Sequence, residues 1–306
     1  MPLPLVYHPV YSIPFPPGHR FPMPKFRLLY EYLQSEQLIK ANNLYAPVGR
    51  CDVEILTLAH CPLYIEQFSE GQLPLKSLKH IGFPWSDALV DRTATAVAGT
   101  VLTAELALQN RLACHLAGGT HHAFYSHGSG FCIYNDLAVC ARQLVVSGRV
   151  NKVLIIDLDV HQGDGTAAIL AEHRETVTCS VHGRLNYPFI KQQSDWDIEL
   201  EDGLTDSAYL NILRFQLPTI LQVEQPDIIL YDAGCDVHGD DRLGRMKLTD
   251  NGIIQRDEYV IRLALEQQIP IACVIGGGYD HDHRKIAQRH GLLHKTAYRL
   301  FEEYGL

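Results

Sequence analysis

The amino-acid sequence predicts an α/β protein with a central, mainly parallel β-sheet flanked by helices. Short apolar runs rich in β-branched residues, such as residues 153–156 and 228–231, recur along the chain, and polar loops and stretches with helical spacing separate them. The chain has no repeats, low-complexity tracts or linker, and its 306 residues are 46% apolar, so it can bury a large core. We therefore expect one wound domain covering residues 1–306.

The first third of the chain is expected to contain few strands. Residues 1–24 hold eight of the sixteen prolines and should be extended and turned, with a short strand at 5–7. Helical spacing predicts a helix at 25–40 and a short one after Asp52, which stands where an N-cap would. A polar connection marked by prolines then leads to a long helix at about 87–111.

From residue 113 onward the pattern repeats as strand, loop and helix. Further strands are predicted at 113–117, 153–156, 177–181, 228–231 and 271–275. Helices are predicted from about Asn135 to Gly148, at 167–173 with Thr166 as cap, at 206–224, at 254–267 and over the last twenty or so residues. Residues 183–205 should form an acidic loop, and the long polar loop at 233–250 is expected to be functional.

Composition excludes several classes of function. The formal net charge is -9 and no run of Lys or Arg occurs, so no nucleic-acid partner is indicated. The eight cysteines are dispersed without a Cys-x-x-Cys pair, which indicates free thiols in a reducing cytoplasm. No signal peptide is recognisable and no apolar run approaches the ~20 residues that span a bilayer, so no membrane partner is expected.

Polar residues follow four of the predicted strands at the point where each strand ends. His121 and His122 follow the first of these strands, a cluster at 157–164 follows the second, and Asp236 and Tyr279 follow the last two. In open parallel sheets the loops at the carboxyl ends of the strands converge on one edge. These residues are therefore expected to meet in one site.

Two carboxylates and one imidazole in this set suit a metal ion. Asp159, His161 and Asp236 are ligands that Zn²⁺ or Fe²⁺ accepts, and three protein ligands leave positions for water and substrate. A structural zinc site would more often use four ligands rich in cysteine. An open metal site implies catalysis.

The remaining polar residues provide candidate acid–base and electrophilic groups. Asp157 and Asp164 are spare carboxylates at the same edge, so they can orient His121 and His122 as two His–Asp pairs. Tyr279 follows three glycines that permit close backbone approach, and its hydroxyl could donate to a developing oxyanion.

Each of these features taken alone has a structural explanation. A His–His pair is more often a polar loop or a packed pair in the core, Asp236 alone reads as a turn residue, and Gly-Gly-Gly-Tyr as a flexible turn. The coincidence of all four loops favours a site. Histidines without an evident partner are interpreted as loop, packing or helix-start residues: His19, His60, His127, His182, His281 and His283.

In order and spacing, five stretches of the chain resemble the zinc-dependent histone deacetylase family of the arginase–deacetylase superfamily. The resemblance extends over nearly the whole chain, and the form of residues 157–163, 241–244 and 19–23 is closest to the class IV-like and bacterial deacetylases. The matching stretches are residues 118–123, 130–136, 157–166, 233–236 with 241–244, and 276–279. The resemblance implies the arginase/deacetylase fold.

The resemblance also implies residue roles. Asp159, His161 and Asp236 match the family's Zn²⁺ ligands, and Tyr279 matches its carbonyl-polarising tyrosine. His121 and His122 match the family's tandem histidines. Asp157 and Asp164 match the carboxylate partners of these two histidines, respectively. The residues implied for the acyl-lysine tunnel are Gly130, Phe131, Tyr187, Leu243 and Gly277. Those implied for a structural K⁺ ion are Asp157, Asp159, His161, Ser180 and Val181.

The expected activity is hydrolysis of acyl groups from lysine side chains of proteins by zinc-activated water. His122 is favoured as general base, with His121 as an electrostatic helper. The family's acidic residue that grips the substrate backbone has no clear counterpart, Asp87 being the nearest candidate, and residues 182–195 differ from the class I pattern.

Two alternatives remain open. One is an acetylpolyamine or other small-amide hydrolase on the same fold, which would use an acidic tunnel mouth built from Asp240, Asp241 and the acidic run at 195–202. The other is a metal-holding binding module without turnover. The expected partner is thus an acyl-lysine peptide or protein, or an acylated small amine, and the sequence predicts no particular oligomeric state.

Overall fold

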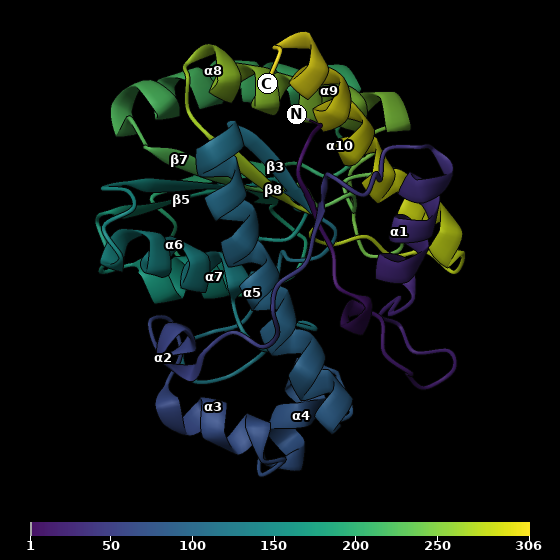
Figure 1. The fold of residues 1–306 in the computed structure, drawn as a ribbon, viewed down its shortest axis with the longest axis vertical. Coiled ribbons are helices and arrows are strands. Elements are labelled where there is room, and N and C mark those ends of the chain that lie inside the picture. The colour runs from purple at the N-terminus through teal and green to yellow at the C-terminus, as the bar shows by residue number, and fades with distance from the viewer. Residues whose placement is uncertain (1) are drawn as a thin grey trace.

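One eight-stranded sheet, in which every paired neighbour runs parallel, forms the centre of the protein. The computed structural model describes residues 2–306 (Figure 1). The strand order is β2-β1-β3-β8-β7-β4-β5-β6. The strands are β1 (Leu5–Val6), β2 (Leu44–Tyr45), β3 (Leu112–His115), β4 (Val153–Asp157), β5 (Thr176–Gly183), β6 (Trp196–Leu200), β7 (Ile228–Asp232) and β8 (Ile271–Val274). The predicted α/β class is confirmed.

Helices cover the sheet on both sides. In Figure 1, α8, α9 and α10 lie above the sheet and α6 and α7 below it, while α2, α3 and α4 form a separate group at the lower end. A 3₁₀ turn, η1, covers Pro9–Tyr11. The α-helices are α1 (Lys25–Ser35), α2 (Val53–Leu56), α3 (Pro62–Ser69), α4 (Leu75–Ile81), α5 (Asp87–Asn110), α6 (Asp136–Val146), α7 (Asp164–Leu170), α8 (Asp206–Glu224), α9 (Asp250–Glu266) and α10 (His283–Glu303).

The inner strands are buried from end to end because helices cover both of their faces. All residues of β4 and all residues of β5 are buried, as β-branched runs in a parallel sheet should be. The edge strand β6 differs: its residues alternate between more and less exposed positions. The sequence there, Trp-Asp-Ile-Glu-Leu, alternates apolar and acidic residues, which is the pattern of a half-covered strand.

Polar caps begin several of the helices. Asn135 accepts a hydrogen bond from the backbone of Ala138 at the start of α6, and Gly148, with φ +68°, follows the end of that helix as the sequence predicts. The prediction that Thr166 caps the next helix is wrong. That helix, α7, begins at Asp164, so Thr166 lies in its first turn, where its hydroxyl hydrogen-bonds Asn135 instead.

Four short elements were not predicted, one of them the two-residue strand β2. Helices α3 and α4 lie in the segment expected to be a polar connection, and β6 lies in the segment expected to be an acidic loop. Each helix has only seven or eight residues, too few for a clear helical period. The acidic residues of β6 lie on its exposed face, which is why the segment read as a loop.

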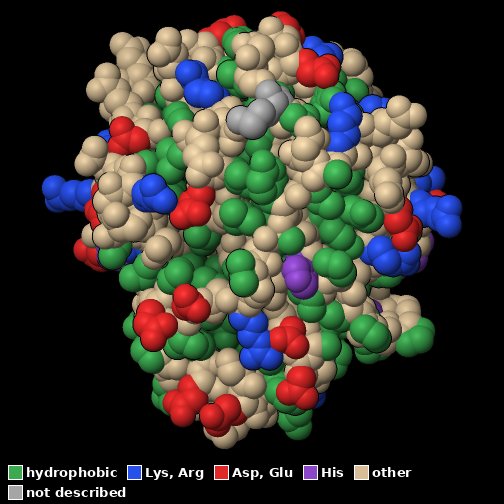
Figure 2. Space-filling model, viewed as in Figure 1, with side chains coloured by type: hydrophobic (Ala, Val, Ile, Leu, Met, Phe, Trp, Pro, Cys, Tyr) green, Lys and Arg blue, Asp and Glu red, His purple; other side chains and the backbone are tan. Residues whose placement is uncertain are grey.

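The surface shows no concentration of basic residues on the face viewed in Figure 2. Lys and Arg side chains there are interspersed with acidic and hydrophobic ones. The eight cysteines are all free, as predicted. Within residues 2–306, the helices are either too short or too polar to cross a membrane.

Candidate active site

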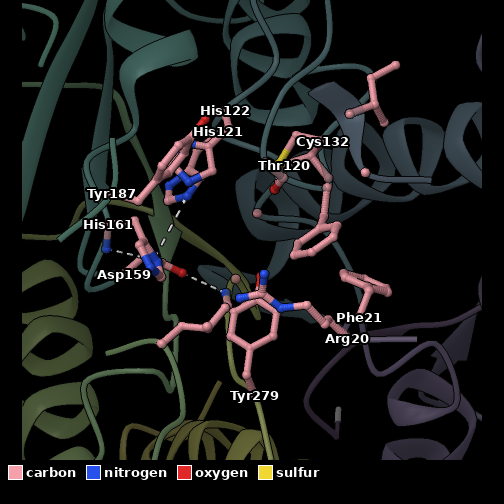
Figure 3. Close-up of a pocket in the computed structure, with 18 of the residues that line it drawn as sticks. Arg20, Phe21, Thr120, His121, His122, Cys132, Asp159, His161, Tyr187 and Tyr279 are labelled. Atoms are coloured by element: carbon pink, nitrogen blue, oxygen red, sulfur yellow. Dashed lines mark hydrogen bonds and ion pairs between the residues drawn. The ribbon is translucent and has the colours of Figure 1, made fainter. Parts of the chain in front are cut away.

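The carboxyl ends of the central strands surround one cavity of about 800 Å³. Loops that follow β3, β4 and β8 contribute His121, Asp159 and Tyr279 to its wall, as the rule for parallel sheets predicts. In Figure 3 these side chains point toward one another from different elements. Residues that the sequence placed in three separate loops therefore share one cavity, whereas Asp236, from the fourth loop, does not line it.

Asp159, His161 and Asp236 converge below this cavity. One potential ligand atom from each lies within 4.8 Å of the others, and all three residues are buried. The Nδ1 atom of His161 is 2.9 Å from Asp159 Oδ1 and 3.1 Å from Asp236 Oδ2. Backbone N–H groups of Gly277 and Val160 donate to the carboxylates of Asp159 and Asp236 at 2.6 and 2.8 Å, which fixes their orientation.

The donor set of this group fits a divalent cation. Burial lowers the pKa of His161, but hydrogen bonds to Asp159 and Asp236 outweigh it and raise the pKa to about 10. An imidazole nitrogen that faces two buried carboxylates needs positive charge between them, either a proton or a metal ion. Two carboxylates with one imidazole suit Zn²⁺ or Fe²⁺.

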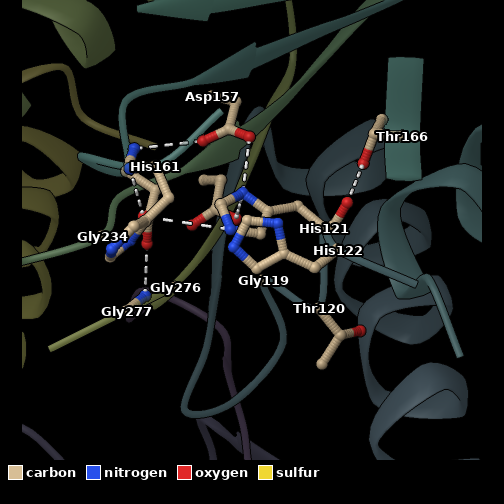
Figure 4. A network of polar contacts seen from close by, with 12 residues as sticks. Gly119, Thr120, His121, His122, Asp157, His161, Thr166, Gly234, Gly276 and Gly277 are labelled. Atoms are coloured by element: carbon tan, nitrogen blue, oxygen red, sulfur yellow. Dashed lines mark hydrogen bonds and ion pairs between the residues drawn. The ribbon is translucent and has the colours of Figure 1, made fainter. Parts of the chain in front are cut away.

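The tandem histidines each face their own carboxylate, in the pairs that the sequence predicts. His121 Nδ1 is 2.8 Å from Asp157 Oδ2, and His122 Nδ1 is 2.6 Å from Asp164 Oδ1. The two imidazole rings lie 4.1 Å apart between centroids. Figure 4 shows His121 linked to Asp157 with the ring of His122 beside it. The Nε2 atom of His121 lies 3.9 Å from Asp159 Oδ1, and both histidines line the cavity.

The two histidines differ in charge. Burial lowers the pKa of His121, but the carboxylates of Asp157 and Asp159 outweigh it and raise that pKa well above its usual range. Burial, followed by the positive charge of His121, lowers the pKa of His122 to about 4. Near neutral pH, His121 is therefore cationic and His122 is neutral.

Asp232 is a buried site residue that the sequence interpretation missed. It lies opposite Asp157 in the register of β7 and β4, and neither of its carboxylate oxygens has a hydrogen-bond partner. Burial, followed by the charge of Asp157, raises its pKa well above the usual range, which favours the protonated acid. Its position at a strand end, equivalent to that of Asp157, was the signal that could have identified it. His121, Asp157 and Asp232 form a second compact group of possible metal ligands.

The glycines before Tyr279 allow the last strand to approach the metal group. A Cβ atom on Gly277 would clash with the carboxylates of Asp236 and Asp159, and one on Gly276 would clash with Asp232. The backbone N–H of Tyr279 donates to Asp241 at 2.6 Å. Burial, followed by the charge of Asp159, raises the pKa of Tyr279 well above its usual range, so its hydroxyl remains a donor.

All five residues predicted for the tunnel line this cavity: Gly130, Phe131, Tyr187, Leu243 and Gly277. Gly130 has φ +52°, and a Cβ atom there would meet the ring of His122. The ring of Tyr187 lies edge-on to that of His122 with centroids 4.9 Å apart, and its hydroxyl hydrogen-bonds Ser129 at 2.6 Å. These aromatic rings give the wall beside His122 an apolar surface.

The N-terminal segment contributes more to the cavity than the sequence suggested. His19, expected to be a loop or packing residue, lines it and hydrogen-bonds the carbonyl of Gly82 at 3.0 Å. Arg20, Phe21 and Lys25 line it too. The ammonium of Lys25 is buried and donates to the carbonyl of Gly276 at 2.9 Å. Only the folded chain brings this segment to the ends of the strands.

The residues predicted to hold a monovalent cation are all buried. Asp157 and Ser180 are opposite each other in the register of β4 and β5. The hydroxyl of Ser180 lies 2.9 Å from Nδ1 of His182. Binding of K⁺ by Asp157, Asp159, His161, Ser180 and Val181 stays a prediction.

The acidic mouth required by a polyamine hydrolase is not formed. Asp240 pairs with Arg289, and Asp241 accepts hydrogen bonds from backbone N–H groups. Asp202 pairs with Arg245 at 3.2 Å. None of these carboxylates lines the cavity, and Asp87, the candidate for gripping the substrate, lies in the first turn of α5 away from the lining.

A parallel sheet that carries two carboxylates and an imidazole beside two His–Asp pairs is the arrangement of a hydrolase with a metal site at its strand ends. The histone deacetylase domain family matches residues 19–292, and the chain belongs to this family. The prediction of the family from the sequence is confirmed.

Relatives and a solved structure agree with this assignment. An uncharacterized protein of Picosynechococcus sp. is 48% identical over 297 residues, which are 97% of this chain and 99% of that one. Histone deacetylase 2 of Arabidopsis thaliana is 28% identical, over 90% of this chain and 74% of that one. Acetoin utilization protein AcuC of Staphylococcus aureus is also 28% identical, over 85% and 72%. The crystal structure of the HDA15 HD domain shares the fold, with a TM-score of 0.80 at 18% identity over 97% of this chain and 90% of that one.

Proposed function

We propose that this protein is a metal-dependent amidohydrolase that removes acetyl or other acyl groups from lysine side chains of proteins. The observation that carries the proposal is the convergence of Asp159, His161 and Asp236 to within 4.8 Å beside a cavity. Membership of the histone deacetylase domain family supports it. In this proposal residues 1–306 act as one catalytic domain.

Asp159, His161 and Asp236 would hold the metal ion, which we propose to be Zn²⁺, with Fe²⁺ as the alternative. Bound there, such an ion would polarise a carbonyl group and would lower the pKa of its bound water toward neutrality. Backbone N–H groups donate to both oxygens of Asp159, from Gly277 and His161, and to Oδ1 of Asp236, from Val160, so the carboxylates are held in place beside the proposed metal position. Such supporting hydrogen bonds tune metal affinity.

His122 acts as the general base in this proposal. It is neutral near pH 7, and its Nδ1 is held by Asp164, so Nε2 is free to take a proton from the attacking water. The same nitrogen then delivers a proton to the leaving lysine amine. His121, cationic through Asp157, stabilises the negative charge that develops during attack.

Tyr279 and the tunnel residues position the substrate. The protonated hydroxyl of Tyr279 donates to the acyl oxygen as it becomes an oxyanion. Phe131 and Tyr187 provide apolar walls suited to the methylene chain of lysine, with Leu243 nearby. An acyl-lysine between these side chains would displace solvent other than the reacting water, which strengthens the hydrogen bonds at the reacting centre.

Three further features belong to the proposal. A structural K⁺ ion is bound next to the metal group by the ends of β4 and β5. The protein acts in the cytoplasm, as its eight free cysteines favour. It belongs to the class IV-like and bacterial branch of the family, as its bacterial relatives support.

A panel of peptides tests the proposal directly. Peptides with one acyl-lysine, bearing acetyl to long acyl groups, are incubated with the protein with and without a chelator, beside acetylpolyamines as a separate substrate class. Hydrolysis of the peptides that the chelator abolishes and added Zn²⁺ or Fe²⁺ restores is expected. Hydrolysis that survives complete removal of divalent metal, or no hydrolysis of any acyl-lysine, would contradict the proposal.

A further inference from the structure

The charge of the cavity lining is opposite to that of the chain. The chain has 35 acidic and 26 basic residues. Among the described residues that line the cavity, Asp159 is the only acidic one, and it is a candidate metal ligand. Five lining residues are Lys or Arg: Arg20, Lys25, Lys79, Arg92 and Arg245. An acidic protein has therefore placed basic groups around its proposed active site.

The mouth of the cavity shows this bias clearly. We define the mouth as the lining residues that are exposed to solvent: Gly18, Arg20, Lys79, His80, Leu185, Phe189 and Arg245. Three of them are Lys or Arg and none is acidic. Asp241 accepts hydrogen bonds from backbone N–H groups, Asp202 pairs with Arg245 and Asp280 pairs with Arg289, and none of these carboxylates lines the cavity.

Two of the cations at the mouth have no partner within residues 2–306. Neither Arg20 nor Lys79 makes an ion pair or a side-chain hydrogen bond in this part of the chain. Arg245 differs, because Asp202 already neutralises part of its charge. Lys79 lies in the last turn of α4, where a cation interacts favourably with the helix dipole. That explanation does not apply to Arg20, which lies in a turn.

Arg20 and Lys79 belong to the same side of the mouth. His19, next to Arg20, hydrogen-bonds the carbonyl of Gly82, the residue after α4. The backbone N–H of Phe131, a tunnel residue, donates to the carbonyl of Ile81 at 2.8 Å. The segment that carries Arg20 and the end of α4 are thus both joined to the wall past which an acyl-lysine would enter.

We propose that the mouth selects acyl-lysines flanked by acidic residues, and that it discriminates against basic peptides and polyamines. This inference rests on the proposed function. Two residues of extended chain span about 7 Å, which is close to the ~8 Å Debye length at physiological salt, so charges within two positions of the acyl-lysine are felt. Exposed ion pairs of this kind typically change binding by up to about 5-fold each.

Three matched peptides test the inference on the metal-loaded protein. They carry the same acyl-lysine and differ only at the two positions on each side, which are Asp, Asn or Lys. We expect kcat/KM to fall in the order Asp, Asn, Lys, by roughly 2- to 5-fold per step, with smaller differences at high salt. Equal values, or faster hydrolysis of the Lys-flanked peptide, would overturn the inference.

Charge reversal at the mouth provides the second arm. The double variant Arg20→Glu with Lys79→Glu should invert the order of the three peptides. Arg174→Glu is the matched control, because Arg174 is exposed, lacks an ion pair in the described chain and precedes β5, at the opposite edge of the sheet. It should leave the order unchanged. An unchanged order in the double variant, or inversion by the control, would contradict the assignment.

Two further measurements separate this inference from the proposed function. If no peptide is hydrolysed, the proposed function fails, and fluorescence anisotropy of the same labelled peptides then tests charge preference through binding alone, with equal affinities overturning it. Acetylspermidine and free Nε-acetyl-lysine are the small-molecule arms. Faster turnover of either one than of the Asp-flanked peptide would contradict selection of an acidic peptide.

Discussion

The floor and the mouth of the cavity are built on different principles. We define the floor as the group Asp159, His161, Asp236, His121 and His122. Every floor side chain is buried and hydrogen-bonded, and each follows the carboxyl end of a central strand. At the mouth, Phe189 is 84% exposed, and Arg20 lacks a partner among the described residues. The sheet therefore fixes the reacting groups, while loops and short helices determine what reaches them.

This difference predicts how the two regions respond to substitution. A floor residue belongs to the proposed reacting groups, so its loss should reduce the reaction rate greatly. Its loss would also leave hydrogen-bond partners unsatisfied in the interior. A mouth residue is solvated, so its loss should change substrate preference and leave stability and chemistry nearly intact. The following experiments test this contrast.

Replacement of the general base should have the largest effect on turnover. His122→Ala removes the neutral imidazole that Asp164 orients, and general acid–base catalysis typically contributes about 10²- to 10⁴-fold. We expect kcat to fall by that factor, measured with an acetyl-lysine peptide, while divalent metal content stays unchanged. His121→Ala should cost less. Equal losses in the two variants would contradict the division of roles.

Tyr279→Phe should have the next largest effect. The variant keeps the ring against Phe131 but removes the hydroxyl that is proposed to donate to the oxyanion. Loss of one such donor typically costs about 10²- to 10³-fold in rate. Single-turnover kinetics should show that loss, and metal analysis should show normal occupancy. A rate within a few-fold of the parent protein would remove Tyr279 from the mechanism.

Acid should destabilise the packed region around the floor. Burial lowers the pKa of His60 to about 4, of His115 to about 3 and of His294 to about 4. In the unfolded chain these groups take up protons below about pH 6.5, so their stabilising contribution is present above that pH and is lost as pH falls toward 4. Each can lower the free energy of unfolding by up to about 2 kcal/mol at pH 5 relative to neutral pH.

Urea unfolding at pH 7.5 and pH 5 measures this effect. The unfolding midpoint should be markedly lower at pH 5. His121 and His161, whose pKa values are raised, oppose the trend, because their contribution is present below about pH 6.5 and is lost only as pH rises through the raised values. A midpoint that is higher at pH 5 than at pH 7.5 would contradict the expectation that the buried neutral histidines dominate the pH dependence.

Substitution of an apolar mouth residue should have the smallest effect. Phe189→Ser removes an exposed ring that lines the cavity, so we expect KM for peptides with apolar flanking residues to rise about 2- to 5-fold, with stability changed by less than ~0.5 kcal/mol. Phe215→Ser is the matched control, because Phe215 is 77% exposed on α8 and does not line the cavity. Equal effects of the two variants would refute a role for the mouth in binding.

The same contrast explains what could be predicted from the sequence. The floor was predicted because β4 is a short apolar run followed at once by polar residues, and parallel strand ends converge. Asp232 was missed because, as a single carboxylate at the end of β7, it stands out only by its equivalence to Asp157 in the register of β7 and β4. Thr166 was wrongly placed as a cap because α7 begins at Asp164, three residues before the predicted start at residue 167.

The mouth could not be predicted in the same way. Helix α4, with Lys79, is too short to give a periodic signal, and Arg20 belongs to a proline-rich segment without regular structure. Their meeting depends on contacts between distant segments, such as the hydrogen bond from His19 to Gly82. The tunnel residues were identified only through resemblance to the histone deacetylase family.

The most direct test of the floor as a metal site is the divalent metal content of purified protein, measured by mass spectrometry together with chelator-sensitive hydrolysis. We expect about one Zn²⁺ or Fe²⁺ per chain, loss of both metal and activity in Asp236→Ala, and retention of both in Asp240→Ala, whose carboxylate is exposed and pairs with Arg289. Full metal occupancy in Asp236→Ala would contradict the assignment of Asp159, His161 and Asp236 as the metal ligands.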